Sequence, residues 1–264
     1  MLAAHGPLER REFFAGAGFR VTCAEYHWGL NNAAGRGENY RLGLVRLVYC
    51  CPFLTSMTNS GEDVPVVMVL LKAPRPGYVK TRLARDIGFP RATRLYRQLA
   101  ERQVRAVPAA FHLEVHYAPR GAAAEMRAWL GERPRYRAQA GGDLGRRLEH
   151  AFARGFARGA ARLLAIGADC PELDGPCLER AAHCLRRCDV VLGPARDGGY
   201  FLIGLRRPAP QLFAGIAWSS AEVLAQTLKR IKECGLSLAL LGEKEDVDDL
   251  ESLRRLRARG VALP

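Results

Sequence analysis

The stretch VPVVMVLLKAPRPGYVKTRLAR, residues 64–85, joins an unbroken apolar run to a loop rich in basic residues. A continuous run of valine, methionine and leucine predicts a strand buried on both faces, as in a parallel sheet covered by helices. Two prolines and a glycine then prevent the chain from continuing as a strand or turning at once into a helix. The basic side chains are therefore expected at the carboxyl end of the strand, where open α/β sheets bind ligands.

This basic loop is a candidate phosphate-binding site. Only five lysines occur in the chain, and two of them lie here. Solvated surface is the plain alternative for basic residues beside a strand end, but their concentration between a strand and a helix favours a phosphate-bearing ligand. The loop matches neither the Walker pattern GxxxxGK[ST] nor GxGxxG. The candidate donor-binding residues are Lys72, Arg75, Gly77, Lys80 and Arg82.

Downstream of this loop, strand and helix patterns alternate to the end of the chain. Such alternation predicts an α/β fold in which a mostly parallel sheet lies between two layers of helices. We expect one domain over residues 61–264. Further strands are expected at 112–117, 136–139, 162–166, 190–193, 200–204 and 236–241, and helices at 79–84, 91–104, 122–130, 143–158, 176–187, 220–234 and 248–259.

Residues 1–60 differ from the rest, because they contain no lysine and no clear period and carry a Gly/Asn-rich stretch at 29–39. We expect a poorly ordered N-terminal extension outside the core. A second hypothesis is that translation starts at Met57, which would make the leader an artefact of start-site assignment. Detection of a peptide from residues 1–56 by mass spectrometry of the native protein would exclude that hypothesis.

Composition limits the function classes. A formal charge of +13 and a pI near 9.8 suit an enzyme of anionic substrates or a nucleic-acid binder. The arginines are dispersed without aromatic interleaving, so nucleic acid is the weaker alternative. Eight cysteines without a CxxC pair argue against zinc, and the chain is too long for a small disulfide scaffold. No apolar run approaches the roughly 20 residues that span a bilayer, and the N-terminus is too charged for a signal peptide, so we expect a cytoplasmic protein without a membrane partner.

A lone carboxylate follows another apolar run, in GADCP at residues 167–171. Glycine and proline shape the turn and present Asp169 at the expected ligand edge. Because a carboxylate and a diphosphate repel each other, the arrangement suggests a divalent cation between them, and Mg²⁺ or Mn²⁺ is expected because hard ions prefer oxygen ligands. The alternative is that Asp169 caps the following helix.

A second group of acids, Asp246, Asp248 and Asp249, precedes the last predicted helix. Either Asp248 or Asp249 must cap that helix, and the others are free for a metal or a ligand. Helix starts favour acids through the helix dipole, so this group alone is weak evidence for a site.

Two glycine-rich loops add candidates. In GPARDGGYF, residues 193–201, a hairpin turn explains the glycines, whereas the functional alternative is close approach of a substrate with Asp197 as acid, base or hydroxyl acceptor. In GGDLGRRL, residues 141–148, Asp143 is a natural helix cap, and the surrounding amides can also hold a nucleotide or phosphate. The candidate donor-binding residues in these loops are Asp143, Gly145, Arg146, Gly198 and Gly199.

The motifs KAPRPGYVKTRLA, GGDLGRRL, GADCPEL, GPARDGGYFLIGL and DVD, in this order, make residues 64–260 resemble a bacterial glycosyltransferase-like family, the radical-SAM/selenodomain-associated transferase 1 group. The resemblance implies the GT-A, Rossmann-like α/β/α fold of nucleotide-diphospho-sugar transferases. It implies that Lys72, Lys80 and Arg82 bind phosphate and that Asp169 and Asp248 bind the metal. The chain departs from the usual DxD motif of that fold, since Asp169-Cys170-Pro171 contains one acid where DxD has two.

Together these features predict a metal-dependent transferase that moves a sugar from a nucleoside diphosphate to a small acceptor. The cation and the basic loop would neutralise charge on the departing diphosphate, with Asp169 as metal carboxylate. Asp197 would position or deprotonate the acceptor. One alternative is nucleotidyl transfer, which releases pyrophosphate, and another is a non-catalytic nucleotide or nucleic-acid binding protein. A GxSxG motif is absent, which argues against a serine hydrolase.

Overall fold

The computed structural model describes residues 10–15, 19–24, 28–30, 38–40 and 63–263. Its main sheet has seven strands in the order β11-β9-β10-β8-β5-β6-β7. All neighbouring strands are parallel except β10, which runs antiparallel to both β8 and β9. The strands are β5 (Val66–Lys72), β6 (His112–Ala118), β7 (Arg135–Ala138), β8 (Leu163–Ile166), β9 (Val190–Pro194), β10 (Tyr200–Leu205) and β11 (Leu238–Leu240).

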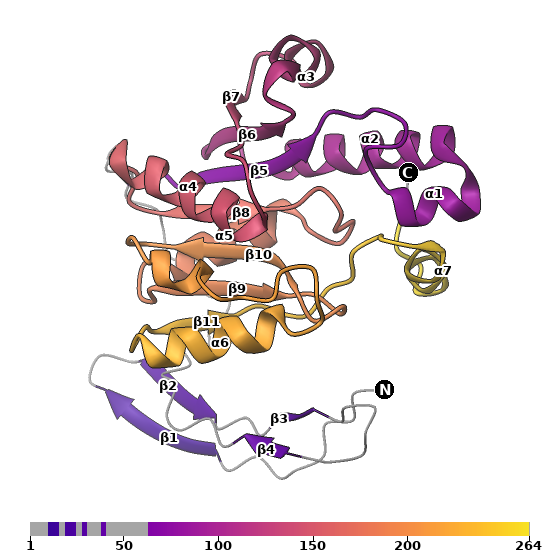
Figure 1. Ribbon diagram of the computed structural model, residues 1–264. Coiled ribbons are helices and arrows are strands. Elements are labelled where there is room, and N and C mark those ends of the chain that lie inside the picture. The colour runs from indigo at the N-terminus through magenta and orange to yellow at the C-terminus, as the bar shows by residue number, and fades with distance from the viewer. Residues whose placement is uncertain (1–9, 16–18, 25–27, 31–37, 41–62, 264) are drawn as a thin grey trace.

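Helices cover both faces of this sheet, which gives the three layers visible in Figure 1. The expected mostly parallel α/β fold is thereby confirmed. The α-helices are α1 (Thr81–Ile87), α2 (Phe89–Ala106), α3 (Ala123–Leu130), α4 (Leu144–Ala157), α5 (Gly175–Cys184), α6 (Val223–Glu233) and α7 (Leu250–Ala258), and two short 3-10 helices are η1 (Arg120–Ala122) and η2 (Pro210–Phe213).

Strand β5 lies at the centre of the sheet and is buried on both faces, as its apolar run predicts. Alternate side chains point to opposite sides of the strand. Val67 and Val69 pack into the core formed with α2, α3 and α5, whereas Met68 packs into the core formed with α4, η2 and α6. A third apolar cluster joins α1, α2 and α7. The cores therefore hold the carboxyl end of β5 in a fixed position.

Several element starts differ from the sequence prediction for local reasons. Helix α6 begins at Val223 and not at Ser220, because the Ser220 hydroxyl donates to the Ala217 carbonyl in a turn. Helix α7 is capped by Asp249, whose side chain accepts from the Ser252 amide at 2.8 Å in a capping box. This cap leaves Asp248 free for other contacts.

Within residues 1–60, the structure describes two short antiparallel strand pairs, β1 (Arg10–Ala15) with β2 (Phe19–Ala24) and β3 (Trp28–Leu30) with β4 (Glu38–Tyr40). The rest of this segment, Met57 included, lies outside the described residues. The expectations about its order and about the translation start therefore stay predictions.

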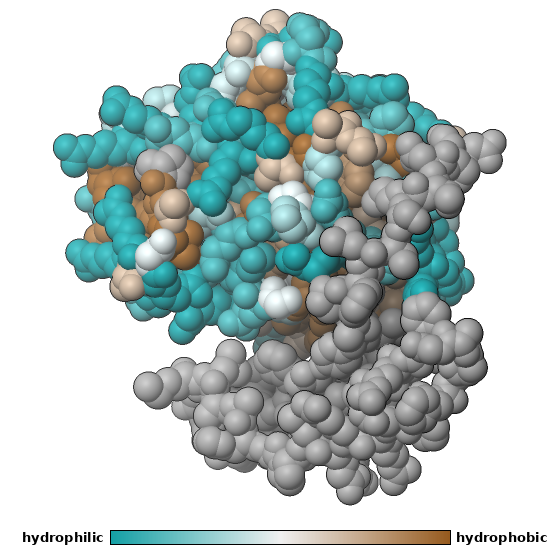
Figure 2. Space-filling model, turned by 180° about the vertical axis from the view of Figure 1, so that it is seen from behind, coloured by the Kyte–Doolittle hydropathy of each residue, from teal (hydrophilic) through white to brown (hydrophobic). Residues whose placement is uncertain are grey.

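Figure 2 shows that most of the surface of the described region in this view is hydrophilic. Among the described residues, no helix combines the length and the apolar character needed to cross a membrane.

Asp189, directly before β9, connects this strand to the residues that follow β10 and precede β11. Its carboxylate accepts from the guanidinium groups of Arg206 and Arg207, both at 2.9 Å, and from the amide and hydroxyl of Ser237. Burial opposes ionisation, but the hydrogen bonds from Arg207, Ser237 and Arg206 outweigh it and lower the pKa of Asp189 below its usual value.

Replacing Asp189 with asparagine is expected to lower the free energy of unfolding at pH 7 by about 2 kcal/mol, because hydrogen bonds to a charged group are lost. A depressed folded pKa stabilises the protein above the unfolded pKa of about 4, and this contribution disappears as the pH falls through the folded value. In urea titrations, the difference between wild type and Asp189→Asn should shrink below pH 4. Glu233→Gln, which removes only exposed ion pairs on α6, should cost less than about 0.5 kcal/mol. A difference that is independent of pH would contradict this assignment.

Candidate functional site

A cavity of about 640 Å³ opens at the carboxyl ends of β5 and β8. This is the edge at which the sequence predicts a ligand, and β5 and β8 are direct neighbours although about 90 residues separate them. Charged side chains from five separate segments reach the cavity. They are Lys72, Lys80, Arg82, Arg147, Asp169, Asp197, Asp246 and Asp248.

Lys80 lies between two carboxylates of this cavity. Its Nζ atom is 2.9 Å from Asp169 Oδ1 and 3.0 Å from Asp248 Oδ1, and its side chain is only 5% exposed. Burial opposes the charge, but the two carboxylates outweigh burial and raise the pKa of Lys80. Its backbone at the start of α1 is left-handed, with φ of 48°, a conformation that costs energy in residues other than glycine. The two predicted acids and the basic loop therefore converge on one point.

Asp246 adds a third acid beside this group. Burial, followed by the negative charge of Asp169, raises its pKa to about 8, although the Lys80 ammonium opposes the shift. Its Oδ1 atom is buried and has no hydrogen-bond partner among the described residues. The sequence prediction leaves Asp246 free for a metal or a ligand but names Asp248 as the second metal ligand.

The acids differ in how well they suit the predicted metal. Carboxylate oxygens suit Mg²⁺ or Mn²⁺, and the unpartnered Asp246 oxygen is the kind of atom that a cation would satisfy. The predicted pair, Asp169 and Asp248, instead holds the Lys80 ammonium between its members. Over the described part of the chain, no three acidic, histidine or cysteine side chains form a ready metal-binding group. Because Asp248 is paired with Lys80 and the Asp246 oxygen has no partner, Asp246 suits a cation better than Asp248 as the second acid beside Asp169.

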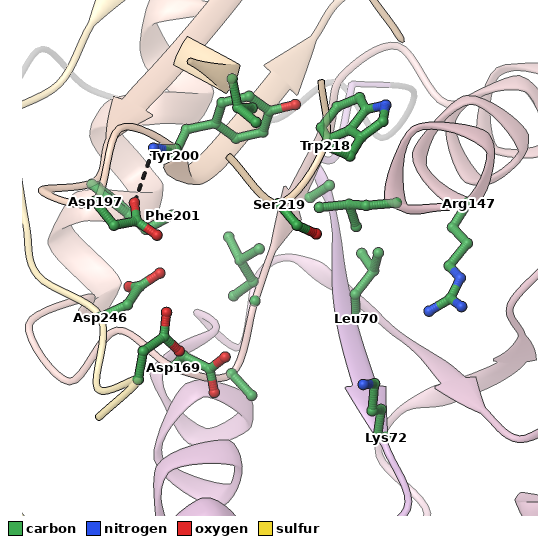
Figure 3. Close-up of a pocket in the computed structure, with 18 of the residues that line it drawn as sticks. Leu70, Lys72, Arg147, Asp169, Asp197, Tyr200, Phe201, Trp218, Ser219 and Asp246 are labelled. Carbon is green, nitrogen blue, oxygen red and sulfur yellow. Dashed lines mark hydrogen bonds between the residues drawn. The ribbon is translucent and has the colours of Figure 1, made fainter. Parts of the chain in front are cut away.

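The opposite wall of the cavity carries basic side chains (Figure 3). Lys72 and Arg147 lie on one side of the view, and Asp169, Asp197 and Asp246 on the other. The backbone of Lys72 is held by the Tyr96 hydroxyl, which accepts from its amide and donates to its carbonyl. The Arg147 Nε donates to the Gly142 carbonyl at 3.0 Å.

The sequence prediction names Arg146, whereas the structure brings the adjacent Arg147 to the cavity. Arg146 is exposed and lies outside the cavity lining, and its amide donates to the Asp143 cap of α4. Successive residues of a helix point about 100° apart, so only one of two adjacent arginines can face the cavity. Both match the same motif, and the phase of the helix decides between them.

The glycines of the predicted loops have packing roles. A Cβ atom at Gly145 would lie 2.2 Å from Trp218 Nε1, so the glycine leaves space for the indole ring. At Gly198, φ is 89° and a Cβ atom would lie 2.1 Å from the Ala221 carbonyl oxygen. Strands β9 and β10 flank this turn as an antiparallel hairpin, as the plain interpretation of the glycines predicts.

Asp197 lies in the same turn and reaches the cavity. Its Oδ1 atom accepts from the Gly199 amide at 2.9 Å, which orients the carboxylate. Leu224 at the start of α6 donates its amide to the Gly198 carbonyl, so the turn is attached to the segment that follows Trp218. The Tyr200 and Trp218 rings pack edge to face at 6.4 Å on this side of the cavity.

The predicted residues thus fall into two groups. Those that line the cavity are Lys72, Lys80, Arg82, Asp169, Asp197, Gly199 and Asp248. Those that lie outside the lining are Arg75, Gly77, Asp143, Gly145, Arg146 and Gly198. Arg75 instead pairs with Glu125 at 2.7 Å, and Gly77 forms a turn with φ of 86°. Lining residues that the prediction leaves unassigned include Tyr96, Gln139, Arg147, Trp218 and Asp246, and no local motif marks Trp218 or Gln139.

A family model described as an uncharacterised protein conserved in bacteria (DUF2064) matches residues 102–220. A protein from Desulfovibrio desulfuricans G20, described provisionally as a nucleotide-diphospho-sugar transferase, is 33% identical over 74% of this chain and 86% of its own, with a TM-score of 0.70. Among curated proteins, no sequence matches this chain.

Two more distant solved structures resemble the chain more weakly. They are a CMP:2-keto-3-deoxy-manno-octonic acid synthetase in complex with CTP (13% identity, 75% of this chain, 98% of that chain, TM-score 0.49) and a Mycobacterium tuberculosis protein in complex with manganese (20%, 72%, 97%, 0.46). Both likenesses are too low to support an argument about function.

Proposed function

Because this chain belongs to the bacterial DUF2064 family and is 33% identical to the Desulfovibrio protein, we propose that it is a transferase that uses a nucleotide-activated donor. More specifically, we propose that it moves a sugar from a nucleoside diphosphate to a small acceptor. The observation that carries this proposal is the cavity in which a basic wall faces an acidic one at the carboxyl ends of β5 and β8.

The basic wall suits the donor. Loss of a nucleoside diphosphate places negative charge on the departing phosphate oxygens, and cations held in place stabilise that charge in the transition state. Lys72 and Arg147 of this wall line the cavity, and Arg82 reaches it from α1. Tyr96 fixes the Lys72 backbone, so its ammonium group starts from a rigid point at the end of β5.

The acidic wall suits the acceptor and a metal ion. Asp197 is exposed to the cavity and oriented by the Gly199 amide, as a group that positions or deprotonates an acceptor hydroxyl must be. Asp169 and Asp246 are the proposed ligands of Mg²⁺ or Mn²⁺, whereas Asp248 stays in its ion pair with Lys80. Such an ion, when bound, would supply further positive charge to the leaving diphosphate.

Thermal unfolding with a panel of nucleotides and nucleotide sugars, with and without Mn²⁺, tests this proposal. We expect at least one nucleoside-diphosphate sugar to raise the Tm in a metal-dependent manner, and its turnover to release the nucleoside diphosphate. Release of pyrophosphate from a nucleoside triphosphate would instead identify a nucleotidyltransferase. If no nucleotide changes the Tm and nucleic acid binds with a steep salt dependence, the protein is a nucleic-acid binder and the proposal is wrong.

A further inference from the structure

We propose that Arg147 and Lys72 bind the diphosphate of the donor, and that Lys80 is a positioning residue that does not bind phosphate. This inference rests on the proposed function. It assigns phosphate binding to Arg147 in place of Lys80. It separates the cations of the cavity by a simple criterion, which is whether a carboxylate already neutralises them.

Lys80 is already neutralised. Its ammonium group contacts Asp169 and Asp248 at 2.9 and 3.0 Å, and 5% of its side chain is exposed. The three side chains together carry a charge of −1, so Lys80 has no unpaired positive charge to offer a phosphate oxygen. The buried ammonium instead bridges the two acids, offsets their mutual repulsion and orients them, and the left-handed backbone at the start of α1 aims the side chain at them.

Arg147 and Lys72 have the opposite character. Neither side chain pairs with a carboxylate among the described residues, and both face the cavity from the wall opposite the acids (Figure 3). The bond from Arg147 Nε to Gly142 fixes the guanidinium group and leaves its two terminal nitrogens free. A planar pair of nitrogens of this kind binds two phosphate oxygens at once, whereas the Lys72 ammonium adds a point charge.

A diphosphate held on this wall would face the acids across the cavity. The group to be transferred would then lie between the basic wall and Asp197. Arg82 also lines the cavity, from α1 beside Lys80, and its contribution is separate from this assignment. The sequence motif that contains Arg147 thus supplies a phosphate ligand one residue later than predicted.

Calorimetric titration of inorganic pyrophosphate, UDP and GDP into the purified full-length protein tests the assignment at one fixed ionic strength. We expect Arg147→Ala to weaken binding of pyrophosphate and of the bound nucleotide at least tenfold, and Lys72→Ala about fivefold. Arg147→Lys should restore part of the affinity. Arg146→Ala is the matched control, since it removes the same charge from the adjacent, outward-facing position, and should change the Kd less than twofold.

Lys80→Arg tests the positioning role. It keeps the positive charge but cannot reproduce both short contacts, so we expect the Kd for pyrophosphate to change less than threefold while kcat falls at least tenfold. Two results would overturn this inference and leave the proposed function standing. One is an equal loss of affinity in Arg146→Ala and Arg147→Ala. The other is tenfold weaker binding in Lys80→Arg together with normal binding in Arg147→Ala. Failure of the wild-type protein to bind pyrophosphate, UDP or GDP would overturn the proposed function together with it.

Discussion

Asp169→Asn is expected to lower turnover about 100-fold or more while leaving the fold intact. Loss of one precisely placed charge from a transferase site costs on the order of 10² to 10³ in rate. Asp169 Oδ1 contacts Lys80, and the negative charge of the same carboxylate contributes to the raised pKa of Asp246. Asparagine keeps the shape of the side chain, and the backbone bond from the Val247 amide to the Asp169 carbonyl is unaffected. Steady-state kinetics with the best donor, together with the Tm, will show the effect.

Glu172→Gln provides the control for this experiment. Glu172 lies three residues further along the same loop, but its carboxylate pairs with Arg259 at 2.8 Å and it lies outside the cavity lining. We expect its kcat to stay within about threefold of wild type, as surface ion pairs contribute little. If Asp169→Asn keeps more than half of the wild-type turnover, neither the metal position nor the acid's catalytic role can be maintained.

Gly198→Ala is expected to lower the free energy of unfolding by about 3 kcal/mol. Two costs add at this position: the positive φ of 89° strains an L-residue, and the new methyl group would meet the Ala221 carbonyl oxygen at 2.1 Å. Backbone atoms cannot move aside as a flexible side chain can. Because Asp197 lies in the same turn, we also expect the kcat of the folded fraction to fall. Urea unfolding and activity measured on the same preparation separate the two effects.

Gly77→Ala isolates the backbone cost. Gly77 has almost the same φ, 86°, but a Cβ atom there would have no neighbour within 4 Å. We expect a loss of about 1 kcal/mol, which is the strain alone. A loss at Gly198 no larger than the loss at Gly77 would show that the turn can shift away from Ala221, and the fixed position of Asp197 would then be in doubt.

Local patterns in the sequence were sufficient for the order and type of the main elements. The unbroken apolar run of β5 reflects burial on both faces. Such a run excludes a strand that exposes one face to solvent. Gly167 and Pro171 end the strand around Asp169, so this residue lies at a strand end whichever strands β8 pairs with. The direction of β10 was open, because a glycine turn permits either a hairpin or a ligand loop, and the structure shows the hairpin.

The site itself depended on contacts that no local pattern contains. The contact between Lys80 and Asp169 exists because β8 pairs with β5. Asp249 and not Asp248 caps α7, and this choice, set by one capping box, releases Asp248 for Lys80. The choice of Arg147 over Arg146 is set by the phase of α4 against the sheet.

By itself, the sequence determined the layered α/β fold, the strand ends at which the cavity opens and most of the charged residues gathered there, because burial and turn formation act over a few residues. Only the tertiary structure decided which charges neutralise each other and which remain free for a ligand. The reason is that electrostatic pairing depends on distances of a few ångströms between segments far apart in the chain, and packing sets those distances.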